Sequence, residues 1–282
     1  MKFNPDNFVQ HKTIVVPDDV EFYVLGDIHG CYDLMMQALK LAGYSEKRGD
    51  YVFCVGDLID RGPDNLKVLG TFLYNKRFHS VMGNHDFFMA NDDYDNWMYN
   101  GGTWVIKDGL DTDTIQGIAE DMANKLPFFI TVEHRGYTYG ICHAGIPFQY
   151  PASGTQPETP NWFKLTNIPQ TWEYLQTVIW DRNVIEEVCF STFKEQLSSD
   201  PYFNRFATAG KQLPLVVPQV NGVAAVFHGH TGVPHPLKYA NRVYLDTGGV
   251  FNGKMTAAHV DKGKIIAFTT DQYDSCGIVT EL

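Results

Sequence analysis

Three short polar segments of the sequence each begin with glycine and place carboxylate, imidazole or amide groups directly behind it. They are Gly26–Gly30 (GDIHG), Gly56–Gly62 (GDLIDRG) and Gly83–Asp86 (GNHD). Asp27 and His29 are separated by one residue, so in extended backbone both side chains point to the same side. Together they offer a carboxylate oxygen and an imidazole nitrogen, a pair that binds divalent cations.

Further groups able to bind cations follow in the later motifs. Asp57 has two carboxylate oxygens and can bridge two cations, and Asn84 offers an amide carbonyl oxygen. His143, in the sequence CHAG, and His230, in GHT, add two imidazoles. A mixture of oxygen and imidazole ligands suits Mn²⁺, Fe²⁺ or Zn²⁺, whereas Ca²⁺ prefers oxygen alone. The residues therefore predict a site for two divalent cations.

Each of the three segments follows a run of residues that is typical of a buried strand. The predicted strands are Glu21–Gly26, Tyr51–Val55 and Phe78–Met82. Helical apolar spacing at Tyr32–Leu41, and again after Pro63, predicts a helix between successive strands. This alternation indicates an α/β sheet, whose ligands bind at the carboxyl ends of the strands. Glycine at each strand end is expected to let the chain turn sharply toward that edge.

The second half of the chain is predicted to be mainly β. A helix at Thr112–Lys125 precedes a hairpin between Phe128–Glu133 and Tyr137–Cys142. Further strands are expected at Gly222–Phe227, Arg242–Leu245, Lys254–Val260 and Lys264–Thr269. We interpret residues 1–282 as a single domain with insertions at about 152–177 and 184–221.

The composition is that of an acidic chain large enough for an enzyme. It has 282 residues and a formal net charge of −11, which disfavours stable binding to nucleic-acid backbone. No uninterrupted apolar run approaches the roughly 20 residues of a membrane span, and Met1–Gln10 lacks the features of a signal peptide. The five cysteines are scattered without paired spacing. We therefore expect a cytoplasmic protein with reduced thiols and no membrane partner.

In combination, the motifs resemble those of one enzyme family. Besides the three glycine-led segments, the matching residues are Cys142–Ala144 (CHA), Val178–Arg182 (VIWDR) and Gly229–Gly253. They are similar to the phosphoprotein-phosphatase-type (calcineurin-like) metallophosphatases, most closely to the compact bacterial and phage enzymes of the lambda type. The resemblance covers about residues 22–148, 176–184 and 224–260. It implies an α/β fold, a β-sandwich of mixed sheets with flanking helices, with the metal site at strand carboxyl ends.

The resemblance also implies how the cations are shared. The ligand sets are Asp27, His29 and Asp57 for the first ion, and Asp57, Asn84, His143 and His230 for the second. Mn²⁺ is the expected ion, with iron or zinc as alternatives. His228, two residues before His230, is not expected to be a ligand.

The chemistry of such a site is phosphate ester hydrolysis. Two cations a few Å apart would lower the pKa of a bridging water and provide a hydroxide in line with the leaving oxygen. Planar guanidinium groups are the expected clamp for the phosphoryl oxygens, and Arg61 and Arg182 are the candidates, together with Asn84. His85 is the candidate general acid for the leaving alkoxide, with Asp60 accepting from its other ring nitrogen. The family's dyad implies the same pair.

Two departures from the protein phosphatase pattern leave the substrate open. The family usually has arginine before GNH and glutamate after it, where this chain has Met82 and Asp86. Both departures, and the segment His143–Gln149, resemble the symmetrical diadenosine tetraphosphate hydrolases, which commonly lack the aspartate present here as Asp60. We predict a phosphatase for phosphoserine or phosphothreonine in a protein or peptide, with phosphotyrosine as a further option. The alternative is a hydrolase of small nucleotides.

Other hypotheses remain open at this stage. An inactive phosphate-binding scaffold would have no use for a general acid, and the acidic charge disfavours the long polyanionic substrates of a nuclease. Arg205, in an unmatched segment, is a candidate replacement for the missing guanidinium. Trp162 and Trp172 are expected to pack beneath the first insertion, with a substrate groove or a purine stack as the alternative.

Overall fold

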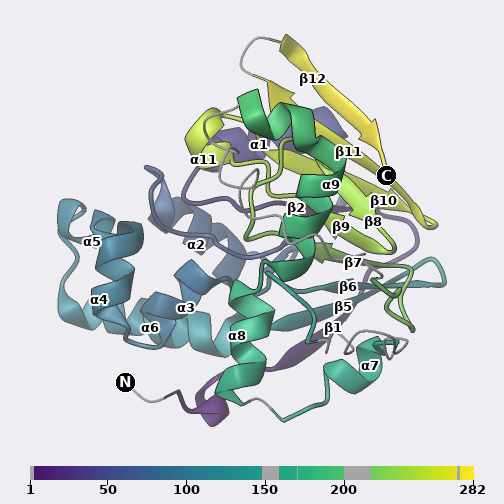
Figure 1. Cartoon of the computed structure of the whole chain (residues 1–282). Helices are drawn as coiled ribbons and strands as arrows, with labels where there is room; N and C mark the ends of the chain where they lie inside the picture. Colours follow the sequence, from purple (N-terminus) through teal and green to yellow (C-terminus); the bar gives the residue numbers. More distant parts are fainter. Residues whose placement is uncertain (1–2, 148–158, 170, 200–216, 272–273) are drawn as a thin grey trace.

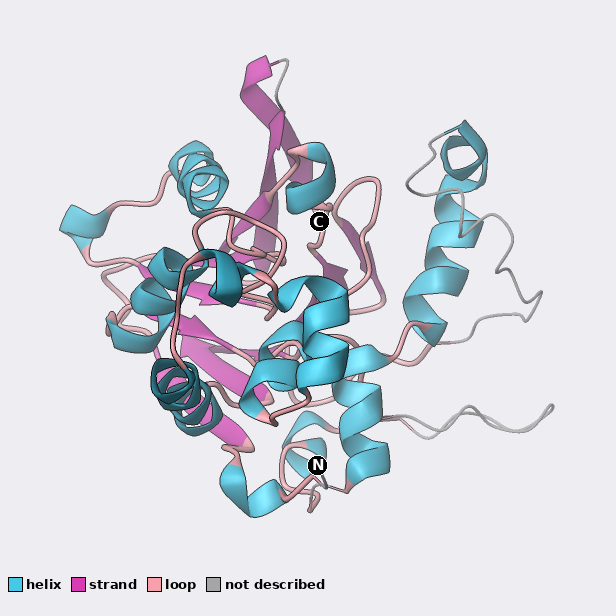
Figure 2. Cartoon of the chain, turned by 90° about the vertical axis from the view of Figure 1, so that its left-hand side faces the viewer, coloured by secondary structure: helices cyan, strands magenta, loops and turns pink. Residues whose placement is uncertain are grey.

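The computed structural model describes residues 3–147, 159–169, 171–199, 217–271 and 274–282, with the side chains of 194–199 left out. Two six-stranded sheets form its centre. Figure 1 shows them as two layers, with helices α3, α4, α5 and α6 gathered on one side. Figure 2 shows the helices around the outside of the strands.

The first sheet has the strand order β12-β11-β10-β2-β3-β4. Its strands are β2 (Phe22–Leu25), β3 (Tyr51–Cys54), β4 (Phe78–Ser80), β10 (Thr256–Asp261), β11 (Lys264–Asp271) and β12 (Asp274–Glu281). Strands β2, β3 and β4 run parallel, whereas β10 is antiparallel to both β2 and β11. The sheet is therefore mixed, with its parallel half supplied by the first 80 residues.

The second sheet has the order β1-β5-β6-β7-β9-β8. Its strands are β1 (His11–Val15), β5 (Phe129–His134), β6 (Tyr137–Ile141), β7 (Ala225–His228), β8 (Leu237–Tyr239) and β9 (Arg242–Tyr244). The β5–β6 hairpin is antiparallel, and β7 lies parallel to both β6 and β9. This sheet is also mixed.

Alternation along the parallel strands explains the layers. In β2, Phe22 and Val24 belong to the core between the two sheets, where they meet side chains such as Tyr139 of the second sheet. The intervening Tyr23 and Leu25 belong to the core beneath the helices. A strand buried on both faces needs such a continuous apolar run. The predicted β-sandwich with mixed sheets and flanking helices is confirmed.

The flanking helices follow the expected apolar spacing. They are α1 (Tyr32–Ala42), α2 (Asn65–Tyr74), α3 (Asn84–Ala90), α4 (Tyr94–Trp97), α5 (Trp104–Lys107), α6 (Thr112–Lys125), α7 (Trp162–Leu165), α8 (Trp172–Trp180), α9 (Asn183–Ser199) and α11 (Gly249–Asn252). Shorter turns are η1 (Pro5–Asn7), η2 (Glu46–Arg48) and η3 (Met98–Gly102). In α1, Met35, Ala38, Leu39 and Ala42 are buried, and the helix ends at Gly43 with φ of 87°.

Most predicted elements are confirmed, with differences at their edges. The helix predicted to open at Pro63 begins at Asn65, because Asn65 Oδ1 accepts from Asp60 N (2.8 Å) and its Nδ2 donates to Gly62 O (2.8 Å). Those bonds hold the preceding loop in a non-helical shape. Leu66, near the start of α2, is 41% exposed, whereas Val68, Leu69, Phe72 and Leu73 form its buried face.

The sequence did not reveal strands β1, β8 and β12, which lie at the edges of the sheets. All five cysteines are free thiols. Among the described residues, no helix has the length and apolar character needed to cross a membrane.

Candidate active site

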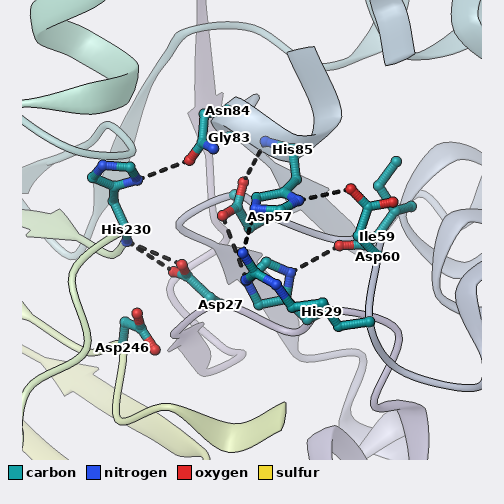
Figure 3. A network of polar contacts seen from close by, with 12 residues as sticks. Asp27, His29, Asp57, Ile59, Asp60, Gly83, Asn84, His85, His230 and Asp246 are labelled. Carbon is teal, nitrogen blue, oxygen red and sulfur yellow. Dashed lines mark hydrogen bonds and ion pairs between the residues drawn. The ribbon is translucent and has the colours of Figure 1, made fainter. Parts of the chain in front are cut away.

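The candidate ligands lie at one edge of the sandwich and come from both sheets. Asp27 and His29 follow β2, Asp57 follows β3, and Asn84 begins α3 after β4. The remaining pair, His143 and His230, follow β6 and β7 of the second sheet. Figure 3 shows Asp57 between the Asn84–His230 side and the His29–His85 side of this cluster. The structure therefore brings together all six residues that the sequence analysis singled out.

Glycines allow these loops to touch one another. A Cβ atom on Gly83 would lie 2.2 Å from Asp57 Oδ1, and one on Gly229 would lie 1.9 Å from Asp27 Oδ1. Gly56 has φ of 107°, as expected for a sharp turn. Gly83, with φ of −87°, does not need glycine for its backbone conformation. Glycine is thus needed at position 83 because this loop approaches the Asp57 carboxylate closely. The expectation that a sharp turn requires glycine is wrong at this position.

Backbone strain is concentrated in the same loops. Among the described residues, the non-glycine residues with positive φ include His29 (47°), Asp57 (53°), Asp60 (77°), Arg61 (73°) and His230 (66°). A side chain in this region costs about 1 kcal/mol or more, and such residues persist where the surrounding structure fixes them. The loops are therefore held in shape by their neighbours.

Backbone carbonyl groups fix the tautomers of the three candidate histidine ligands. His29 Nδ1 donates to Ile59 O (2.8 Å), His143 Nδ1 to Val55 O (2.7 Å) and His230 Nε2 to Trp180 O (3.1 Å). A carbonyl oxygen can only accept, so the facing ring nitrogen carries the proton and the other nitrogen carries a lone pair. This is the arrangement typical of metal-binding histidines.

The lone pairs of these three histidines face oxygen atoms, and that of His29 also accepts from Arg61 Nη1 (2.6 Å). His230 Nδ1 lies 2.8 Å and His143 Nε2 lies 3.1 Å from Asn84 Oδ1. His143 Nε2 and His29 Nε2 also lie 3.5 Å and 3.6 Å from the two oxygens of Asp57. Since no proton is available between these acceptors, a cation between them would satisfy both sides. The donor set therefore fits divalent metal ions.

Burial sets the charges of this cluster. It lowers the pKa of His29 to about 3 and also lowers the pKa of His143 and His230, so the three imidazoles are neutral at pH 7. Burial alone would raise the pKa of Asp57, but the positive charge that His143, His85, His29 and His230 carry when protonated lowers it below its ordinary value. An ionised carboxylate among neutral imidazoles is the state that a divalent cation needs.

Asp27 lies at the His230 side of the cluster. Both of its carboxylate oxygens accept from His230 N, at 3.2 and 3.0 Å. On the other side of the cluster, His29, Asp57 and His85 offer ligand atoms that lie within 4.8 Å of one another. Burial, followed by the charges of Asp246 and Asp57, raises the pKa of Asp27.

The candidate proton donor and phosphate clamp lie beside this cluster. His85 Nδ1 lies 2.7 Å from Asp60 Oδ2, and both side chains are buried. Arg61 donates to His85 Nε2 (2.7 Å) and to His29 Nε2 (2.6 Å). The ring of Phe251, which is 55% exposed, lies 5.1 Å from the Arg61 guanidinium.

A family model named calcineurin-like phosphoesterase matches residues 20–234, which include all six candidate ligands. The chain belongs to this family. The resemblance to phosphoprotein-phosphatase-type metallophosphatases is therefore confirmed, and the chain is a metal-dependent hydrolase of phosphoric esters.

Known relatives of this calcineurin-like phosphoesterase have two kinds of name. Serine/threonine-protein phosphatase 1 of Salmonella typhimurium is 29% identical over 242 residues, or 84% of this chain and 91% of that protein. The symmetrical bis(5'-nucleosyl)-tetraphosphatase of Buchnera aphidicola subsp. Schizaphis graminum is 42% identical over 69 residues, or 24% of each. A solved serine/threonine phosphatase of Saccharomyces cerevisiae has a TM-score of 0.55 at 13% identity, covering 98% of this chain and 83% of that one. It supports the fold.

The second expected clamp, Arg182, lies at the edge of the phosphoesterase site. It follows α8 and donates through Nη1 to His230 O (3.3 Å) and Thr231 Oγ1 (3.1 Å). Its charge also contributes to lowering the pKa of His230. Arg182 therefore lies on the His230 side of the cluster, whereas Arg61 lies on the His29 side.

The structure also explains the two departures from the protein phosphatase pattern. Met82 is fully buried among apolar side chains, so no polar group reaches the site from that position. The Asp86 carboxylate accepts from Leu58 N (2.9 Å) and Gly83 N (2.9 Å) and joins two of the ligand loops. Asp86 is thus a buried link between loops rather than a group facing substrate.

Other candidates have mixed outcomes. Phe148, Gln149 and Arg205 lie outside the described residues. Trp162 is fully buried and donates to Thr131 Oγ1 (2.7 Å), so packing is confirmed for it. Trp172 is 41% exposed and packs against Trp180, with ring centroids 5.6 Å apart.

Two further features concern residues near His230. The sequence analysis missed Asp246, which follows β9 and lies beside Asp27 in Figure 3. Burial raises its pKa to about 6, with the Asp57 charge adding to the effect. The sequence pattern that could have revealed Asp246 is the one shared by the other ligand loops, a strand followed by a carboxylate and glycine, here in LDTGG.

His228 faces away from the candidate ligands. Its Nδ1 lies 3.4 Å from Cys142 Sγ.

Proposed function

We propose that the chain is a phosphomonoesterase that removes phosphate from phosphoserine or phosphothreonine in proteins or peptides, and that phosphotyrosine is a further substrate. The observation that carries this proposal is the buried His85–Asp60 pair, with 2.7 Å between Nδ1 and Oδ2, next to the ligand Asn84. A serine or threonine alkoxide is a poor leaving group and needs a proton in the transition state. The nucleotide released from a dinucleoside polyphosphate leaves as a stable anion and needs an acid much less.

We assign the metal ligands to the six residues of the cluster. They are Asp27, His29, Asp57, Asn84, His143 and His230, which are joined by the contacts described above, and we propose two Mn²⁺ ions. When bound, two such ions supply Lewis acidity that activates a water as the nucleophile and offsets the charge of the phosphoryl oxygens. The neutral, pre-oriented imidazoles and the ionised Asp57 support this assignment.

The side chains around the ligands perform the remaining steps. Arg61, Arg182 and the Asn84 amide bind phosphoryl oxygens. Arg61 donates to His29 Nε2 through Nη1 (2.6 Å), and this N–H group would be available to a phosphoryl oxygen if His29 Nε2 held a metal ion. In its doubly protonated form, in which Nε2 carries a proton instead of accepting from Arg61, His85 gives that proton to the leaving oxygen, while Asp60 accepts from Nδ1 and fixes the orientation of the ring.

Hydrolysis of a symmetrical dinucleoside tetraphosphate is the second candidate function. It is favoured by the apolar Met82, which supplies no second guanidinium, and by the 42% identity to the tetraphosphatase over 69 residues. The match to the Salmonella protein phosphatase is weaker in identity but extends over 84% of this chain.

Direct competition between the two substrates tests the proposal. The protein is stripped of metal, restored with manganese, and given a phosphoserine peptide and diadenosine tetraphosphate in parallel. Asp57→Asn serves as the blank for contaminating phosphatases. We expect a kcat/KM that is clearly higher for the peptide. Faster cleavage of the dinucleotide would replace the protein phosphatase assignment with the nucleotide one.

A further inference from the structure

Two buried tryptophans meet the aspartate of the His85–Asp60 pair. Trp97 Nε1 and Trp104 Nε1 each donate to Asp60 Oδ1 at 2.9 Å. Trp97 is the last residue of α4, and Trp104 is the first residue of α5. The two indoles therefore approach one carboxylate oxygen from two different helices.

The two oxygens of the Asp60 carboxylate have different hydrogen-bond partners. An indole N–H only donates, so both tryptophans hold Oδ1 as an acceptor. The other oxygen, Oδ2, is left to face His85 Nδ1 at 2.7 Å. Fixing one oxygen fixes the plane of the carboxylate, and that plane determines where the imidazole ring points.

The turn between the two tryptophans is built to lie on the Asp60 loop. Gly101 has φ of 124°, and a Cβ atom there would lie 3.0 Å from Arg61 Cγ. A Cβ atom on Gly102 would lie 2.7 Å from the ring of Trp97. Larger residues at these two positions would push the indoles away from the carboxylate.

We propose that Trp97 and Trp104 are positioning residues for proton transfer: they hold Asp60 so that His85 presents its Nε2 to the leaving oxygen. This inference rests on the proposed function, in which His85 is the general acid. It makes the segment Tyr94–Lys107 a part of the active site, although the tryptophans touch neither the candidate ligands nor the phosphate clamps in the contacts described.

The test removes the two N–H groups and keeps an aromatic ring at each position. Trp97→Phe, Trp104→Phe and the double variant are compared with wild type on a phosphoserine peptide and on p-nitrophenyl phosphate. We expect the double variant to lose about 10²-fold in kcat on the peptide and only a few-fold on the aryl ester, whose leaving group needs no acid. Each single variant is expected to lose roughly tenfold on the peptide.

A matched control separates this effect from damage to the fold. Trp162 is also fully buried and donates its N–H to Thr131 Oγ1 (2.7 Å). Trp162→Phe should change both substrates by the same small factor. Equal losses on both substrates in the Trp97 and Trp104 variants would overturn the inference and leave a purely structural role.

A double-mutant cycle identifies His85 as the group through which the tryptophans act. In a His85→Asn background, removal of the two indole N–H groups should cause no further loss on the peptide. Fully additive losses would contradict the proposal.

A measurement without turnover keeps the inference separate from the proposed function. If wild type hydrolyses neither ester, the proposed function fails, but the His85 Nδ1 proton still gives a low-field NMR resonance that His85→Asn removes. We expect the double tryptophan variant to shift or broaden this resonance and Trp162→Phe to leave it in place. An unchanged resonance in the double variant would overturn the inference.

Discussion

Histidines and carboxylates gather at both ends of strand β2, with opposite results. At one end, Asp57, His143 and His230 offer ligand atoms within 4.8 Å of one another, and at the other end Glu21, His134 and Asp261 do the same. Residue types alone would make both groups candidate metal sites. The two groups differ in the source of the positive charge that neutralises their carboxylates.

The Arg135 cluster, which consists of Glu21, His134, Arg135, His259 and Asp261, contains its own cation. Arg135 pairs with Glu21 Oε1 (2.8 Å) and Asp261 Oδ1 (2.7 Å), and His259 Nε2 lies 2.9 Å from Glu21 Oε2. Burial would raise the pKa of Glu21, but hydrogen bonds from Arg135 and His259 lower it to about 2. The carboxylates of this cluster are already neutralised.

The active-site cluster has the reverse balance. Burial and neighbouring carboxylates raise the pKa of Asp27 and Asp246, and the three candidate histidine ligands are neutral. Their lone pairs face oxygen atoms of Asn84 and Asp57 rather than hydrogen-bond donors, except where Arg61 reaches His29. Buried negative charge with free lone pairs binds divalent cations, whereas an arginine-paired cluster stabilises the fold.

The largest expected effect is at Asp57, the residue shared by both halves of the proposed metal site. Asp57→Asn should lower manganese-dependent phosphate release by at least about 10³-fold, because it removes the carboxylate that faces both His29 and His143. Glu21→Gln is the matched control from the other cluster and should keep wild-type kcat. Comparable losses in the two variants would remove the distinction between the clusters.

The next effect concerns the acid rather than the metals. His85→Asn should slow hydrolysis of a phosphoserine peptide by about 10²-fold to 10³-fold and of p-nitrophenyl phosphate by only a few-fold. The amount of bound manganese should stay as in wild type. Equal losses on both esters would argue that His85 binds metal or phosphate instead, which its place beside His29 and Asp57 makes a real alternative.

The smallest effect lies in the Arg135 cluster. Arg135→Gln should lower the free energy of unfolding by about 1–3 kcal/mol and leave kcat unchanged. The pKa of Glu21 is depressed from 4.5 to about 2 in the folded state, so its stabilisation is complete above pH 4.5 and is lost as pH falls toward 2. Urea unfolding should therefore show the two proteins converging across this pH range. A constant difference down to pH 2 would assign the effect to packing.

Sequence patterns predicted the parts of the molecule that depend on local residues. The candidate ligands were found because each follows a strand and stands beside glycine, as Asp57 does after β3. The reason given for the glycines was correct at Gly56 but not at Gly83, where contact with another loop decides. Contacts between loops are not visible in one segment alone.

The features that the sequence did not reveal are contacts and strands that depend on residues far away in the chain. Trp97 and Trp104 donate hydrogen bonds to Asp60 across 37 and 44 residues, and no local sequence pattern beside them indicates this partner. Strand β1 pairs with β5, more than 100 residues away, and its own exposure pattern is irregular. Strand β12 lies at the edge of its sheet and is largely exposed, so it lacks the apolar run of a buried strand.

Metal stoichiometry measured together with turnover tests the central claim most directly. The metal-stripped protein is titrated with manganese, and bound metal per chain is determined alongside phosphate release from a phosphoserine peptide. The account predicts two ions per chain, activity that rises with their binding, and loss of both in Asp57→Asn. Full activity in the metal-stripped protein, or undiminished manganese binding in Asp57→Asn, would contradict it.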